Sequence, residues 1–62
     1  MEQLAEAIRD GMCYHVFSEG TLLQSFYFPG SAAAFASSQR NRGVKHVQVK
    51  YLTNNLTEEK LA

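Results

Sequence analysis

The chain of 62 residues contains a single cysteine, Cys13, only one proline and no tryptophan. A lone cysteine excludes an internal disulfide, and two scattered histidines with one cysteine do not form a structural zinc site. A chain of this length makes one small domain and buries only about 60% of its unfolded surface, so it usually needs extra stabilisation. With disulfide and zinc excluded, the sequence predicts a compact core, oligomerisation or both.

Long apolar runs are also missing. No stretch approaches the roughly 18 consecutive apolar residues that would span a bilayer. The first dozen residues are charged and lack the apolar segment of a secretory signal. Because a single unpaired cysteine fits a reducing compartment, we expect a cytoplasmic protein that does not associate with membranes.

Acidic residues are absent from the whole stretch 20–57, although the chain as a whole is neutral. Residues 1–19 have a net charge of −3 and residues 58–62 a net charge of −1. The middle has a net charge of +4, because its only charged residues are Arg40, Arg42, Lys45 and Lys50. Either the acidic ends fold against this basic middle, which we favour because four charges are few, or the middle faces an anionic partner.

What is present is a clear series of secondary-structure patterns. Apolar residues recur every four positions from Leu4 to Met12, which predicts an amphipathic helix over residues 2–12. Aromatic and β-branched residues then predict strands over residues 13–17 and 22–28. Because the link between them is short and contains glycine, these strands form an antiparallel hairpin.

The best-delimited element is a second helix over residues 31–42. The pair Pro29-Gly30 stops the preceding strand, Ser31 is placed as an N-cap, and four alanines around one phenylalanine follow. Arginines suit the negative end of the helix dipole, and Gly43 suits the left-handed residue that closes the helix.

A third strand follows over residues 44–52, where apolar and polar residues alternate. Val47, Val49 and Tyr51 share one face of this strand, and we assign that face to the core. The remaining residues, 53–62, are predicted to be a polar C-terminal tail that is frayed rather than helical.

The order of these elements predicts an α+β fold of class αββαβ. A helix between the second and third strands is a crossover, so the third strand runs parallel to the second and antiparallel to the first. The simplest arrangement is a small three-stranded antiparallel sheet of order 2-1-3, with the crossover helix on one face. The domain would comprise an N-terminal helix at 1–12, a ββαβ core at 13–52 and the tail at 53–62.

This arrangement leaves the second face of the sheet bare, because we expect the N-terminal helix either to help cover the same face as the crossover helix or to extend to a partner. The hairpin strands are apolar on both faces, with Leu22, Gln24 and Phe26 on one and Leu23 and Ser25 on the other. A large exposed apolar patch usually indicates a partner. The second strand is also a sheet edge with no lysine or proline to protect it. We therefore expect a homodimer, or a strand added by a target protein.

Catalytic patterns are almost absent. Neither His15 nor His46 belongs to a known catalytic motif with an acidic partner. Both are predicted to lie on the sheet surface. Cys13 is predicted to be a small buried residue, and Pro29-Gly30-Ser31 is only a weak anion-binding pattern. No phosphate loop, dinucleotide fingerprint or metal-ligand spacing exists. The sequence predicts no enzyme, no catalytic or metal-binding residue and no cofactor.

Binding residues can be proposed on the basis of exposure and charge. An exposed hairpin face would anchor a protein partner through its aromatic residues, and the basic residues would direct it to an acidic or nucleic-acid-binding surface. The candidate partner-binding residues are Phe26, Tyr27, Phe28, Arg40, Arg42, Lys45, His46 and Lys50. As an alternative, the basic strip over residues 40–50 would bind nucleic acid through phosphates. The isoelectric point of about 6.7 is lower than usual for such domains.

The layout of a hairpin, an alanine-rich helix ending in Arg40-Asn41-Arg42-Gly43 and a Val-x-Val strand resembles small proteins of phages and mobile elements. The resemblance covers roughly residues 13–52. It implies a stoichiometric binder, such as an inhibitor of a host enzyme or defence complex. We therefore expect a small non-enzymatic protein-binding module, with nucleic-acid binding as the alternative.

Overall fold

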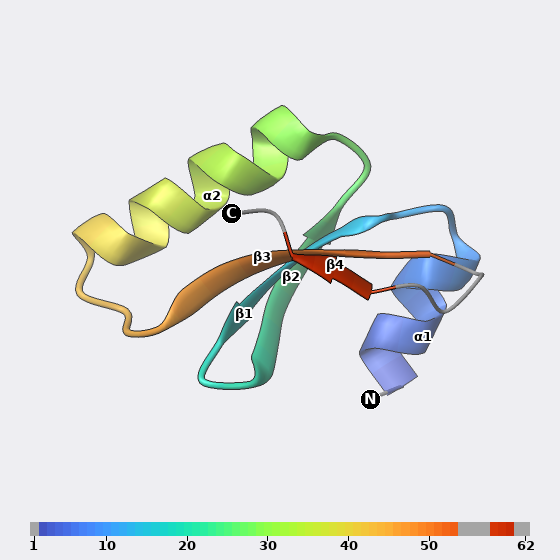
Figure 1. The fold of residues 1–62 in the computed structure, drawn as a ribbon, viewed down its shortest axis with the longest axis horizontal. Coiled ribbons are helices and arrows are strands. Elements are labelled where there is room, and N and C mark those ends of the chain that lie inside the picture. The colour runs from blue at the N-terminus through green and yellow to red at the C-terminus, as the bar shows by residue number, and fades with distance from the viewer. Residues whose placement is uncertain (1, 54–57, 61–62) are drawn as a thin grey trace.

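The computed structural model describes residues 2–53 and 58–60 of the chain. Two helices and four strands follow in the order α1 (Glu2–Arg9), β1 (Tyr14–Ser18), β2 (Thr21–Phe26), α2 (Pro29–Asn41), β3 (Val47–Leu52) and β4 (Glu58–Lys60). The strands form one sheet of order β2-β1-β3-β4, in which every neighbouring pair is antiparallel. Figure 1 shows α2 on one side of this sheet and α1 on the other.

The predicted fold class is confirmed. The first three strands lie in the order β2-β1-β3, and β3 runs parallel to β2 because both are antiparallel to β1. The structure adds β4, which pairs with β3 where the sequence predicted part of a frayed tail. Its residues have low β-propensity, so no local pattern indicated a strand. Pairing with the free edge of β3 stabilises this strand, which local propensity does not favour.

The core lies between the sheet and α2. Val16, Ala32 and Ala36 are fully buried, and Val47 is nearly so. Two of these four residues are alanines of α2, and small side chains allow a helix to approach a sheet closely. The assignment of the Val47 and Val49 face to the core is confirmed, since Val49 packs against this cluster.

The hairpin between β1 and β2 turns on two residues with positive φ, Glu19 at 51° and Gly20 at 81°. This is the combination of a type I′ turn, which matches the twist of the strands it joins. Leu23 forms a bulge in β2, because Val16 pairs with Gln24 whereas the next residue of β1 pairs with Leu22. The bulge moves Leu22 to the other face of the sheet, so the predicted facing of Leu22 with Gln24 is wrong.

The boundaries of every predicted element shift, and two of these shifts have a clear physical cause. The second helix begins at Pro29 rather than Ser31, and its N-cap, Phe28, makes no side-chain capping hydrogen bond. Proline favours the first helical position, where its missing N–H is not needed. The third strand begins at Val47 rather than Val44, because His46 has a φ of 54° and interrupts the extended backbone. Gly43, with a φ of 90°, follows the helix as predicted.

The face opposite α2 is not bare. α1 packs against β2 on this face, so the prediction that this face is bare is wrong. Phe17 is only 5% exposed here and His15 is fully buried, so the predicted surface position of His15 is wrong. Within the described part of the chain, no helix combines the length and apolar character needed to cross a membrane.

Candidate protein-binding surfaces

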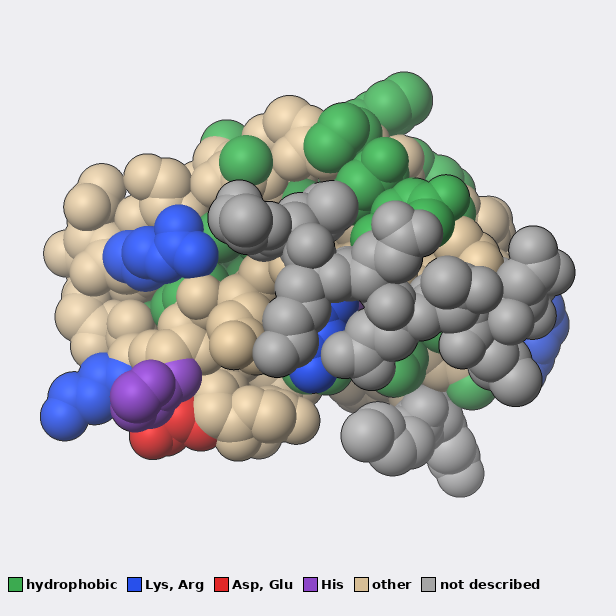
Figure 2. Space-filling view, viewed as in Figure 1, with side chains coloured by type: hydrophobic (Ala, Val, Ile, Leu, Met, Phe, Trp, Pro, Cys, Tyr) green, Lys and Arg blue, Asp and Glu red, His purple; other side chains and the backbone are tan. Residues whose placement is uncertain are grey.

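The candidate binding residues divide into two groups at opposite ends of α2. Phe26, Tyr27 and Phe28 precede the helix, whereas the basic residues of 40–46 lie at its last turn and in the loop that follows. Eleven helical residues, 29–39, lie between the two groups and separate them by roughly 18 Å at 1.5 Å per residue. In Figure 2 a group of basic and histidine side chains lies at the left end and hydrophobic side chains gather at the upper right, while further basic side chains lie at the centre and the right edge. The candidate residues therefore do not form one continuous surface.

The group before α2 is itself divided by burial. Phe26 packs against the core cluster, with its ring centroid 5.4 Å from that of Phe35. Tyr27 and Phe28 are 53% and 68% exposed, and they are the two most exposed large hydrophobic residues of the described chain. We call Tyr27 and Phe28 the aromatic end. Phe26 stabilises the fold, and only the aromatic end is available to a partner.

The aromatic end continues directly from β2, an edge strand whose neighbour lies on one side only in the described sheet. Leu23, at the bulge of β2, is a further large hydrophobic residue exposed at 37%. Edge strands present unpaired backbone groups that can accept another strand. The aromatic end and β2 therefore form one contiguous surface of apolar side chains and available backbone.

The basic end comprises Arg40, Arg42, Lys45 and His46, all of which have exposed side chains. One guanidinium nitrogen of Arg40 donates to the carbonyl oxygen of Val47 at 3.0 Å, which ties it to the start of β3. The backbone N–H of Glu19 donates to the carbonyl oxygen of His46 at 3.4 Å, so an acidic residue lies beside this group. The positive charge of the basic end is thereby reduced on one side.

Lys50 does not extend the basic end. It pairs with His15 across the strands, on the face opposite α2. Its Nζ lies 5.1 Å from the ring centroid of Phe17, a distance at which a cation is attracted to the ring. The predicted basic strip over residues 40–50 is therefore interrupted.

His15 is the one buried polar residue among those that the structure describes. Its Nε2–H donates to the carbonyl oxygen of Leu52 at 3.2 Å, because a carbonyl can only accept. Nδ1 therefore carries no proton and accepts from the hydroxyl of Ser25 at 2.7 Å. Burial removes water from the ring and lowers the pKa of His15, an effect larger than the opposing effect of hydrogen bonds to the backbone of Leu52 and Met12.

A histidine that accepts a proton from a serine hydroxyl has the elements of a nucleophilic pair. Here the ring is fully buried in the sheet, where no substrate can reach it. The described residues also contain no group of three metal-ligating side chains. The pair is best explained as a hydrogen-bonded support that links β1 to β2 and to the end of β3.

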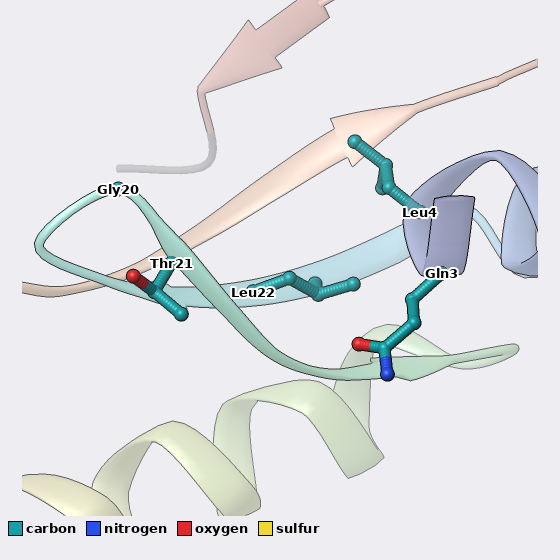
Figure 3. A pocket seen from close by; sticks show the side chains of 5 residues that line it. All are labelled: Gln3, Leu4, Gly20, Thr21 and Leu22. Carbon is teal, nitrogen blue, oxygen red and sulfur yellow. The ribbon is translucent and has the colours of Figure 1, made fainter. Parts of the chain in front are cut away.

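A small cavity lies on the α1 face, beside the start of β2. It has a volume of about 200 Å³ and is lined by Gln3, Leu4, Gly20, Thr21 and Leu22. Figure 3 shows the lining residues of α1 and of β2 on the two sides of this space. A Cβ atom added at Gly20 would meet nothing within 4 Å, so the turn leaves the cavity open.

The sequence did not predict this cavity, because the cavity depends on where along β2 the helix α1 packs. It also missed the pairing of His15 with Ser25. An unbulged hairpin closed at Glu19 and Gly20 would place His15 opposite Gln24, whereas the bulge at Leu23 brings Ser25 there.

Comparisons of the chain with protein-family models, with curated proteins and with solved structures give no match. The function is therefore inferred from the sequence and from the geometry of the two surfaces.

Proposed function

We propose that this chain is a small non-enzymatic protein-binding module, in which the aromatic end and the edge of β2 take up a partner polypeptide. The observation that carries the proposal is the exposure of Tyr27 and Phe28, at 53% and 68%, at the end of an edge strand. Aromatic residues bury a large area with little loss of conformational freedom and are enriched at protein interfaces. Backbone pairing along β2 would add directional hydrogen bonds.

The mode of action that we propose is stoichiometric binding in the cytoplasm, in which the module blocks a host enzyme or defence complex. The resemblance to small phage and mobile-element proteins supports this mode, and the single unpaired cysteine supports the compartment. The comparisons add nothing to either statement.

Nucleic-acid binding at the basic end is the weaker candidate. Arg42 and Lys45 are exposed and available for phosphate contacts. Three features oppose a strong interaction: the engaged guanidinium of Arg40, the nearby Glu19 and the separate position of Lys50.

The test compares variants at the two ends. A partner isolated on the immobilised protein is purified and titrated against the wild type and against Phe28→Ala, a change at an exposed side chain. We expect affinity to fall about tenfold, which is the loss typical of an interface anchor. Ala33→Ser on the exposed side of α2 is the matched control and keeps wild-type affinity.

Labelled DNA and RNA provide the competing measurement. If these bind at low salt, and Arg42→Ala with Lys45→Ala weakens them while Phe28→Ala does not, the nucleic-acid alternative replaces our proposal. Equal affinity of wild type and Phe28→Ala for the purified partner would also contradict the proposal.

A further inference from the structure

The two edges of the described sheet differ in their protection. Every residue of β4, Glu58–Lys60, is charged, and the strand is only three residues long. β2 has six residues, with no charge and no proline among them. Natural proteins protect exposed edges with charge, proline, short strands or bulges. β4 has two of these protections and β2 has one, the bulge at Leu23, so β2 is the less protected edge and the one suited to receive another strand.

We propose that the strand received by β2 is β2 of a second copy of this chain, in antiparallel orientation about a twofold axis. The inference rests on the proposed function and divides its surface: the edge of β2 pairs with a second copy, and the exposed side chain of Phe28 remains for the partner polypeptide. In a twofold interface each surface meets a copy of itself. A charged strand would meet like charges there, and the absence of charge from β2 removes that repulsion.

The register of the pairing follows from the strand length. Two strands over Thr21–Phe26 overlap completely in one antiparallel register, with Thr21 opposite Phe26 of the other copy. Leu23 then lies opposite Gln24 of the other copy at the centre of the interface. Both of these side chains are exposed in the single chain. One step beyond the strand, Tyr27 lies opposite Gly20 of the other copy.

This register brings the aromatic end to the cavity. Gly20 lines the cavity of about 200 Å³ on the α1 face. Tyr27 lies toward the same face, since its Cε1 is 3.8 Å from the position of a Cβ atom at Gly11, just beyond α1. Each copy therefore presents an exposed tyrosine at the level of an open space in the other. The contact occurs twice, because the axis relates the two copies.

The decisive experiment is sedimentation equilibrium on the full chain with paired charge variants. In this register, Leu23→Lys with Gln24→Lys places lysines directly opposite lysines twice, and Leu23→Glu with Gln24→Glu does the same with glutamates. We expect a dimer for the wild type, a monomer for each double variant alone, and a heterodimer when the two are mixed. Ser37→Lys with Ser38→Lys, on exposed positions of α2, is the control that remains a dimer.

Tyr27→Ala tests the cavity contact separately. We expect dimerisation to weaken about tenfold or more, with an unchanged circular dichroism spectrum, because the side chain is half exposed in the single chain. A monomeric wild type at millimolar concentration would overturn the inference, as would lysine double variants that still dimerise.

The same variants separate this inference from the proposed function. If the wild type is monomeric and Phe28→Ala still weakens a purified partner, the second copy is wrong and the protein-binding surface stands. If neither dimerisation nor partner binding responds to changes in β2 and the aromatic end, both proposals fail.

Discussion

The two faces of the sheet are buried by different means. On the α2 face, the fully buried residues are Val16, Ala32 and Ala36, and no polar side chain is buried among them. On the α1 face, the fully buried residue is His15, held by Ser25 and by the carbonyl of Leu52. One face is stabilised by close apolar packing, and the other by a hydrogen-bonded imidazole under a short helix.

The difference shows how a chain of this size covers both faces of a sheet. α2 has thirteen residues and meets β1, β2 and β3, whereas α1 has eight residues and contacts mainly β2. A short helix covers little area, and long polar or aromatic side chains from the sheet fill the remainder. The fold is thus expected to tolerate changes in size poorly on the α2 face and changes in charge poorly on the α1 face.

The largest expected effect is on the α2 face. Ala36→Leu inserts three carbons where the helix contacts the sheet and should lower the free energy of unfolding by about 3 kcal/mol. The matched control is Ala33→Leu on the exposed side of the same helix, which should change stability by less than about 0.5 kcal/mol. Urea unfolding of the three proteins measures both. Equal stability of the two variants would show that the helix is not seated as described.

A smaller effect is expected on the α1 face. Ser25→Ala removes the hydroxyl that donates to Nδ1 of His15 and should lower the free energy of unfolding by about 1 kcal/mol. Ser37→Ala, at an exposed position of α2, provides the control with the same change of side chain. In the variant, Nδ1 is left without its donor. An unchanged stability of Ser25→Ala would mean that this hydrogen bond is not formed in solution.

The last prediction is the most specific and concerns the pH dependence of stability, for which we expect the smallest effect at neutral pH. Burial lowers the pKa of His15 below its usual 6.5, so the unfolded chain binds a proton more readily than the folded one. The stability contributed by the neutral ring is therefore present above pH 6.5 and is lost as the pH falls below that value toward the pKa of the folded state.

Unfolding measured between about pH 5 and pH 8 tests this sign. His15→Gln should remove much of the loss on acidification, whereas His46→Gln, at an exposed loop position, should keep it. If His46→Gln abolished the pH dependence and His15→Gln did not, the role assigned to buried His15 on the α1 face would be wrong.

The sequence predicted the fold class, the strand order and the valine face of β3, because these follow from strong local periodicity and one rule about crossovers. It also predicted the open edge at β2. It did not predict the buried state of His15, since local alternation alone cannot show which face of the sheet a helix will cover.

Two further errors of the sequence-based prediction arise from local backbone features that change the position of residues further along the chain. The bulge at Leu23 changes the facing of every residue before it in β2, and no residue type at that position indicates a bulge. The positive φ of His46 shortens β3 and turns the basic end away from the strand. The division of the candidate residues into two ends therefore depends on the backbone path, which local sequence patterns do not give.

The central position of β1 also orders the events of folding. β1 pairs with β2 through a turn of two residues, whereas it pairs with β3 only after the chain has passed through α2. Hairpins form in about 1–10 μs, and closing a longer loop costs more entropy before it yields contacts. We expect the hairpin to form early, and docking of β3 with α2 to limit the rate. A change at Val47 or Val49 would then slow folding more than a change in the hairpin turn.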